Sequence, residues 1–229
     1  MEVDRVAEEV VFDEFQRLFD GGERFSVLSE EAGLRSFGAD YPLVLVDPVD
    51  GSLNAKQGLP LFALMLAVLD GPSVGDTYAG AVLNLTTGEE WTAIRGQGAM
   101  RSGKPIKVLA RSEESRIQIL GLESTPRALT AARALVERST KIRILGSMAI
   151  SLALTASGGF DVFSAPIPIR VFDTAASLLL IREAGGVSTD SDGQPLGGLT
   201  CSLETRSTLL CAPTAELHAE ALALLRAQR

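Results

Sequence analysis

Two aspartates that closely follow an apolar run are the most informative residues of this sequence. They belong to Asp47-Pro48-Val49-Asp50-Gly51-Ser52, which comes after the run 43–46. Pro48 fixes one backbone φ angle and Gly51 permits a close backbone approach, so this turn can aim both carboxylates and the Val49 carbonyl at one point. Oxygen ligands gathered in this way suit Mg²⁺, which takes substrate phosphate oxygens and water for its remaining positions. Taken alone, the same motif is equally typical of a solvated turn.

Two further acidic signals stand at expected element boundaries. Glu30-Glu31 comes at the end of a predicted strand, and Asp173 comes immediately before a predicted helix. Each has an ordinary alternative, because Glu30-Glu31 could be a surface acidic pair and aspartate is a common helix N-cap. The backbone NH groups of Gly51 and Ser52 could hold a phosphate, especially where a helical turn starts. Together these residues favour a site for a cation and a phosphate.

The elements that must position these residues are predicted from the spacing of apolar residues and from turn residues. The first half reads as a helix at 4–19 followed by strands at 25–29, 43–46, 62–69, 78–84, 90–95 and near 106–108. The second half alternates strands at 117–122, 142–145, 160–163 and 207–212 with helices at 125–137, 147–156, 173–184 and 214–227. We therefore expect an α/β fold with an N-terminal α+β half at 1–110 carrying the metal-binding turn and a C-terminal α/β half at 111–229.

Composition narrows the class of protein. The chain has 229 residues, of which 46% are hydrophobic and 22% charged, which excludes disorder. Its net charge of −8 disfavours nucleic-acid binding, whereas a bound metal ion would still let it bind an anionic substrate. Cys201 and Cys211 are expected as buried thiols of a reducing compartment. The sequence shows no signal peptide, and its longest apolar stretch, 59–69, is too short to cross a bilayer, which predicts a soluble, cytoplasmic protein.

Several segments resemble, in consistent order, the signatures of the inositol monophosphatase family. The matching segments are Ser29-Glu30-Glu31, Asp47 to Ser52 with Asn54, the hairpin 96–108, Arg143 to Ala149, and Phe172 to Ala176 with Glu183 to Gly186. The variants Asp50 to Asn54 and Arg170 to Asp173 are most similar to the archaeal-type branch, which includes dual inositol monophosphatase/fructose-1,6-bisphosphatases. The resemblance implies a layered α/β/α/β/α fold and a Mg²⁺-dependent phosphatase.

The resemblance also implies residue roles. Two or three Mg²⁺ ions are expected, for which Mn²⁺ can substitute, and Glu30 would also face the third, weaker site. The implied metal ligands are Glu30, Asp47 and the Val49 carbonyl for the first ion, and Asp47, Asp50 and Asp173 for the second. Ser52 stands where the family has Thr or Ser, and its hydroxyl would help Glu30 to orient and deprotonate the attacking water. Hydrolysis would then be direct, with Glu30, Asp47 and Ser52 as the catalytic residues.

The implied substrate is a small sugar or polyol phosphate, such as inositol 1-phosphate or fructose 1,6-bisphosphate. The candidate substrate-binding residues are Asp50, Gly51, Ser52, Met148, Arg170 and Asp173. Arg170 suits bidentate phosphate recognition, with an ordinary ion pair as its alternative. Met148 has the hydrophobic core as its alternative.

Some features depart from the family pattern, and other functions stay open. Ser29 stands where glycine is usual, Phe172 replaces a common tryptophan, and the sequence shows no match to the family's long first helix. That departure would expose apolar surface, which a partner in a homodimer could cover. The alternatives are a nucleotide 3′-phosphatase of the same family and a catalytically impaired relative that binds a phosphorylated ligand or a protein partner. The intact set of acidic ligands favours the enzyme.

Overall fold

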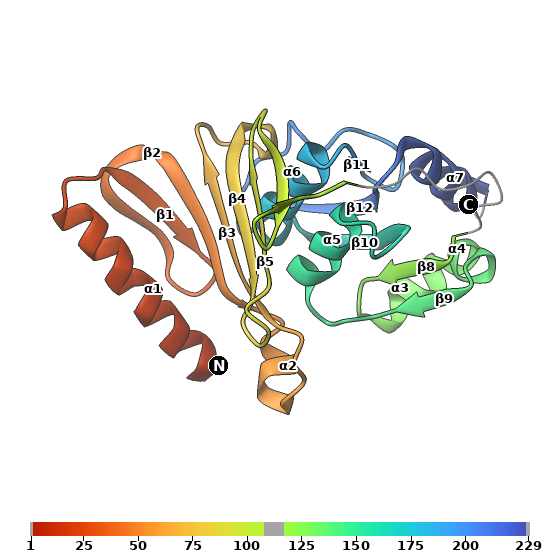
Figure 1. The fold of residues 1–229 in the computed structure, drawn as a ribbon, viewed down its shortest axis with the longest axis horizontal. Helices are drawn as coiled ribbons and strands as arrows, with labels where there is room; N and C mark the ends of the chain where they lie inside the picture. The colour runs from red at the N-terminus through yellow and green to blue at the C-terminus, as the bar shows by residue number, and fades with distance from the viewer. Residues whose placement is uncertain (1, 108–116, 228–229) are drawn as a thin grey trace.

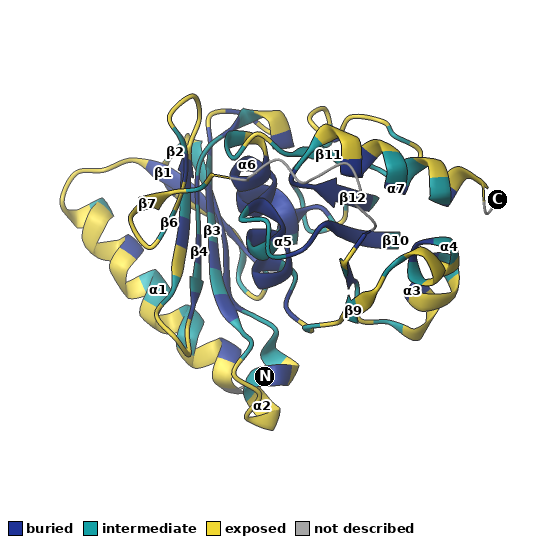
Figure 2. Ribbon diagram, turned by 45° about the vertical axis from the view of Figure 1, so that its right-hand side comes forward, coloured by how far each residue is buried: buried dark blue, intermediate teal, exposed yellow. Residues whose placement is uncertain are grey.

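The computed structural model describes residues 2–107 and 117–227, which form two β-sheets with helices between and outside them. In Figure 1 helix α1 (Glu2–Asp20), the first sheet, helices α5 (Met148–Ala156) and α6 (Ala175–Glu183), and the second sheet follow one another from left to right. Helices α3 (Pro126–Ala131), α4 (Arg133–Arg138) and α7 (Ala215–Ala227) cover the outer side of the second sheet, to the right in Figure 2. This arrangement confirms the expected layered α/β/α/β/α fold.

The first sheet has seven strands in sequence order. They are β1 Phe25–Ser29, β2 Gly33–Asp50, β3 Ala63–Leu69, β4 Thr77–Asn84, β5 Glu90–Ile94, β6 Gly98–Arg101 and β7 Lys104–Pro105. Strand β2 has two arms, and β1 lies between them, since Ser26 is paired with Ser36 on the first arm and with Leu43 on the second. The second arm runs parallel to β1 and ends in the aspartate turn.

The second sheet has five strands in the order β11-β12-β10-β8-β9. They are β8 Ile119–Leu122, β9 Lys141–Arg143, β10 Val162–Arg170, β11 Val187–Thr189 and β12 Arg206–Ala212. The α-helices are α1 Glu2–Asp20, α2 Ser52–Gln57, α3 Pro126–Ala131, α4 Arg133–Arg138, α5 Met148–Ala156, α6 Ala175–Glu183 and α7 Ala215–Ala227, with 3₁₀ turns η1 Val74–Asp76 and η2 Phe172–Thr174.

Helices α5 and α6 form the buried middle layer (Figure 2). Every residue of α6 from Ala175 to Ile181 is buried. Small residues let this helix approach the first sheet closely, because a Cβ at Gly80 would lie 3.0 Å from Cα of Ala176. The helix that begins just after Asp173 is therefore fixed against the sheet that carries the other acidic residues.

Most predicted elements are confirmed, and the differences have local reasons. The strand predicted at 160–163 continues to Arg170, because its prolines sit at an irregularity of the β10–β12 pairing between Ala165 and Ile169 and need not donate there. The strand predicted at 142–145 ends at Arg143, and the Leu145 carbonyl instead accepts a hydrogen bond from the Asn54 side chain.

Two further predictions of elements need correction, and some elements were not predicted. The single helix predicted at 125–137 is two helices, α3 and α4, which meet at Ala132, and nothing in the sequence marks the break. The last strand of the first sheet is Lys104–Pro105; Ile106 and Lys107 are not in a strand, and Val108 lies outside the described residues. The sequence predicted neither the first arm of β2 nor the short elements α2, β6 and β11.

Two expectations from composition can be compared with the fold. Cys201 and Cys211 are free and buried, as expected, and burial raises the pKa of the Cys201 thiol to about 12. Across residues 2–107 and 117–227, no helix combines the length and the apolar character that a membrane-spanning helix requires.

Candidate active site

Parallel strand pairing brings Glu30 and Asp47 together. Strand β1 runs parallel to the second arm of β2, and Ser29 is paired with Val46. The residue that follows this pair is an acid in both segments, Glu30 just after β1 and Asp47 within β2, so the two carboxylates lie at the same edge of the sheet. Asp47 is held in place by its own turn, since its Oδ1 accepts the Val49 NH at 3.0 Å.

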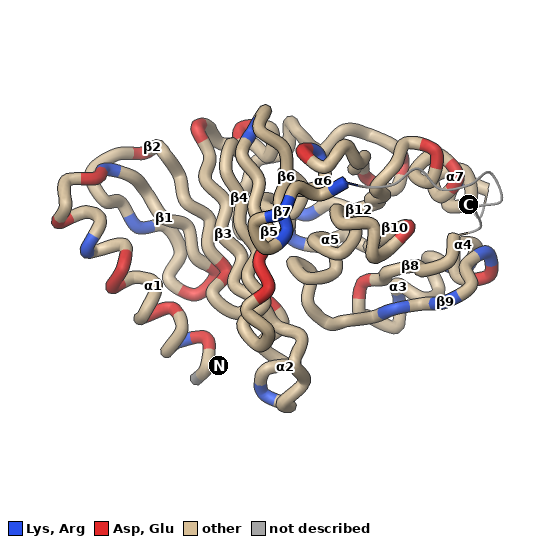
Figure 3. Tube along the Cα trace, in the orientation of Figure 1, with Lys and Arg blue, Asp and Glu red and all other residues tan. Residues whose placement is uncertain are grey.

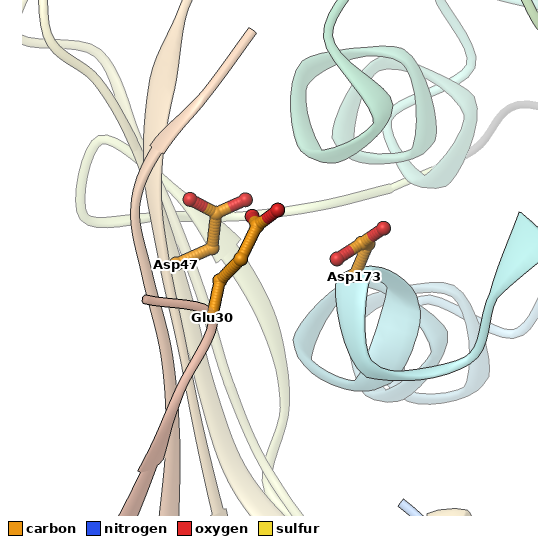
Figure 4. A group of neighbouring side chains, drawn as sticks. All are labelled: Glu30, Asp47 and Asp173. Atoms are coloured by element: carbon orange, nitrogen blue, oxygen red, sulfur yellow. The ribbon is translucent and has the colours of Figure 1, made fainter. Parts of the chain in front are cut away.

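Asp173 completes the cluster from the opposite side (Figure 4). It lies in η2, directly before α6. One carboxylate oxygen from each of Glu30, Asp47 and Asp173 lies within 4.8 Å of the other two. The Oδ1 atom of Asp173 is buried and has no hydrogen-bond partner among the described residues. Three carboxylates from distant parts of the chain, one with an unpartnered buried oxygen, are suited to hold a cation.

The electrostatics of this cluster favour the same ligand. Burial raises the pKa of Asp47 to about 8, and the nearby charges of Asp50, Glu30 and Asp173 add to the effect. Burial also raises the pKa of Asp173 to about 6, although Arg170 opposes the shift. Without a cation these groups resist ionisation, whereas a divalent ion would stabilise their charged forms.

Arg170 lies at the acidic cluster itself. It is the last residue of β10 and donates from Nη1 to Glu30 Oε1 at 2.6 Å and from Nε to Asp173 Oδ2 at 3.0 Å. The ion pair given above as its alternative is therefore present, and it joins two predicted metal ligands. Its predicted contact with substrate is not tested by this geometry.

Asp50 is directed to the beginning of α5 and does not belong to the cluster of three carboxylates found among the described residues. Its Oδ1 accepts the Met148 NH at 3.1 Å, its Oδ2 accepts the Ala149 NH at 2.8 Å, and the Ser147 hydroxyl also donates to Oδ2. Burial raises the pKa of Asp50 in spite of these bonds. Asp50 thus links the aspartate turn to the N-terminus of α5, through the backbone of Met148.

The aspartate turn is held tightly at Gly51. Its φ is +91°, and a Cβ there would lie 3.0 Å from the Leu61 carbonyl oxygen and 3.2 Å from that of Gly146. Gly51 is the N-cap of α2 and Ser52 is its first residue, so the predicted phosphate-binding NH groups are at a helix start. The Asn54 side chain, to which the sequence assigned no role, donates to the carbonyls of Leu61 and Leu145, both at 2.7 Å.

The Ser52 hydroxyl donates to the Val49 carbonyl oxygen at 3.2 Å. The buried Asp4 of α1 lies near the same hydroxyl and interacts with it electrostatically. Burial raises the pKa of Asp4, but nearby polar groups, Ser52 among them, outweigh the effect and lower it. Asp4 was not among the predicted site residues. It lies on the same side of α1 as Val11 and Phe15, which pack on the sheet, and an aspartate there carries no local sequence signal of a contact with Ser52.

A small cavity of about 160 Å³ lies beside Asp50. Two segments of the second half contribute most of its lining. One is the start of α5, with Ser147 and Met148, and the other is the end of β8 with Glu123 just after it. Met148 lines this cavity, and its contact with substrate stays a prediction. Sequence analysis missed Glu123, which is fixed by accepting the Thr125 NH at 3.0 Å.

The layered fold and its acidic site are those of a metal-dependent phosphatase, an enzyme that hydrolyses phosphoric monoesters. The chain belongs to the inositol monophosphatase family, whose sequence model matches residues 1–229. This result confirms the resemblance drawn from the motifs.

Relatives and solved structures agree with this assignment. The fructose-1,6-bisphosphatase/inositol-1-monophosphatase of Thermococcus kodakarensis is 36% identical over 193 residues, which are 84% of this chain and 70% of the relative. The enzyme of the same name from Methanothermobacter thermautotrophicus is 33% identical over 208 residues, covering 86% and 74%. The structure of the IMPase from Thermotoga maritima matches with a TM-score of 0.82 and 27% identity, covering 99% of this chain and 83% of that one.

Proposed function

We propose that this chain hydrolyses small sugar or polyol phosphate monoesters, inositol 1-phosphate or fructose 1,6-bisphosphate among them, with a water activated by bound metal. The observation that carries the proposal is the cluster of Glu30, Asp47 and Asp173, with its unpartnered buried oxygen. The names of the archaeal relatives support this substrate class.

The donor set fits Mg²⁺, since it consists of hard carboxylate oxygens that three separate elements bring together. We propose that Glu30, Asp47 and Asp173 hold the metal, with Asp50 and the Val49 carbonyl as further ligands. Two Mg²⁺ ions are proposed, with a third, weaker site at Glu30, and Mn²⁺ is a proposed substitute. When bound, such ions offset phosphate charge, lower the pKa of water and align the attacking and leaving oxygens.

The residues of the chain supply positioning and proton transfer. The Ser52 hydroxyl, which donates to the Val49 carbonyl and lies near Asp4, would orient the attacking water, and Glu30 would accept a proton from that water. The NH groups of Gly51 and Ser52 would bind the phosphate at the start of α2. Met148 and Arg170 would contact the rest of the substrate, with Asp50 and Asp173 accepting hydrogen bonds from its hydroxyl groups.

A substrate panel tests the proposal. Purified chain is assayed for phosphate release from inositol 1-phosphate, fructose 1,6-bisphosphate and nucleotide 3′-phosphates, with Mg²⁺ and with EDTA. We expect Mg²⁺-dependent release from the first two and none in EDTA. Turnover no greater than that of an Asp47→Asn control on every substrate would leave the impaired, ligand-binding relative as the better description. A clear preference for a nucleotide would favour the 3′-phosphatase.

We also propose that the protein works as a cytoplasmic homodimer without a nucleic-acid partner. The net charge of −8 supports the last point, because it opposes contact with a phosphate backbone. Light scattering of the eluting protein on a sizing column would measure the dimer, and a mass matching one chain would contradict it.

A further inference from the structure

The turn that carries Glu30 is fixed from outside the sheet by helix α1. Glu30, Glu31 and Ala32 form this turn between β1 and β2. Acidic residues recur along α1 (Figure 3), and one of them, the half-buried Glu8, reaches the turn. The function proposed above does not use Glu8.

Glu8 holds the turn at both of its ends with one carboxylate oxygen. Its Oε1 accepts the Ala32 NH at 3.0 Å and also accepts the hydroxyl proton of Ser29, which is fully buried. Ser29 is the last residue of β1 and Ala32 is the last residue of the turn. The two bonds therefore bracket Glu30, and both are charge-assisted, which makes them stronger than neutral hydrogen bonds.

A fixed turn matters because the charges at this site oppose its assembly. Glu30 lies close to Asp47 and Asp173, and carboxylates at such separations repel one another. The Glu30 side chain is 34% exposed, so packing alone does not fix its position. A metal site whose ligands are already in place binds its ion more tightly than one that must first be ordered.

We propose that Glu8 is a positioning residue for the metal site, which holds the turn 30–32 so that Glu30 meets Asp47 and Asp173. The proposal rests on the proposed function, since it assigns Glu30 to a metal. It also explains the serine at position 29, because a glycine there would lack the hydroxyl that Glu8 accepts.

Three variants of the full chain test the proposal. Glu8→Ala removes both bonds, and Glu8→Gln keeps an oxygen that can accept them without the charge. Glu9→Ala is the matched control, because it removes the same kind of side chain from the next position of α1, where Glu9 pairs with Arg5 and is 62% exposed. Melting temperatures establish that each variant is folded.

Two measurements are made on each variant. Hydrogen exchange is followed in EDTA for a peptide spanning 28–34, and Mn²⁺ binding is measured by calorimetry. We expect exchange about tenfold faster in Glu8→Ala than in Glu9→Ala, and Mn²⁺ affinity lower by about 10- to 100-fold. Glu8→Gln should lie between Glu8→Ala and the wild type in both measurements.

Equal exchange and equal Mn²⁺ affinity in Glu8→Ala and Glu9→Ala would overturn the proposal. Equal Mn²⁺ affinity with faster exchange would also overturn it, because Glu8 would then hold the turn without serving the metal. A wild-type chain that bound no Mn²⁺ would overturn the proposed function instead, and the exchange data would still show whether Glu8 holds the turn.

Discussion

At the scale of single residues, the repulsion between the carboxylates of the acidic cluster is offset by the positive charge of Arg170. Glu30, Asp47 and Asp173 approach one another closely, and Arg170 bridges two of them. In the protein without metal, Arg170 thus offsets part of the negative charge of the cluster. A bound divalent ion would take over part of that role, so the importance of Arg170 for stability depends on metal.

Replacing Arg170 should therefore destabilise the metal-free protein most. We expect Arg170→Gln to lower the free energy of unfolding in EDTA by about 1–2 kcal/mol, because two half-buried charge-assisted hydrogen bonds are lost. This decrease in the free energy of unfolding should be smaller in saturating Mn²⁺, because the bound ion then offsets the same carboxylates. Urea unfolding measures both values, with Arg133→Gln as the control, since it removes an exposed pair of little weight. An equal loss with and without Mn²⁺ would contradict this account.

The pH dependence of the metal-free protein follows from the same cluster. The folded-state pKa of Asp47, about 8, lies above its ordinary value of 3.8, so the folded chain binds the extra proton between these values. Stability in EDTA should thus fall as pH rises from about 5 to about 8. Melting temperatures across this range test the sign, and Asp47→Asn, which cannot ionise, should flatten the curve. Stability that rises over this range in the wild type but not in Asp47→Asn would refute it.

Mn²⁺ binding should show the opposite pH trend. Because the ion requires charged carboxylates, its affinity should increase between about pH 5 and about pH 8, with protons released on binding. Calorimetry in two buffers of different ionisation enthalpy measures the released protons. Affinity that stays constant over this range would show that the ligands are already ionised.

At the scale of elements, the turn after β2 depends on close contact as much as on its acids. It packs against the segment before α5, so that Gly51 lies beside Gly146, and Asp50 reaches the start of α5. The metal-binding turn and the cavity beside Asp50 are therefore one unit. A shift of a few tenths of an ångström in the turn would move both.

Gly51→Ala should consequently lower the free energy of unfolding by more than the unfavourable positive φ of an alanine would lower it alone. Gly88 has a similar positive φ, +72°, with nothing within 4 Å of a Cβ placed there, so Gly88→Ala measures the conformational cost by itself. We expect about 1 kcal/mol for Gly88→Ala and about 2–4 kcal/mol for Gly51→Ala, with a large loss of phosphatase activity only in the second. Urea unfolding and the inositol 1-phosphate assay provide the values, and equal costs would show that the clash is relieved.

At the scale of the whole molecule, local sequence predicted the elements but not how they meet. The run 43–46 and the turn after it identified Asp47, and the end of β1 identified Glu30, because apolar periodicity is a local property. The contacts of Asp4 with Ser52 and of Glu8 with Ser29 depend on where α1 packs, which no local pattern encodes. The division into 1–110 and 111–229 falls among residues outside the described ranges and stays a prediction.

The outer side of the first sheet carries the last prediction. A groove of about 1040 Å³ lies between α1, α2 and the sheet, and apolar side chains line most of it, including Val6 and Val10, which are 47% and 60% exposed.

An apolar surface of this extent on a folded chain should bind a hydrophobic dye such as anilinonaphthalene sulfonate. We expect Val6→Gln to lower the dye fluorescence by about half, because it places an amide in the groove without disturbing the helix. Leu34→Gln is the matched control, since Leu34 is 68% exposed and does not line the groove. Equal fluorescence in the two variants would mean that the dye binds elsewhere.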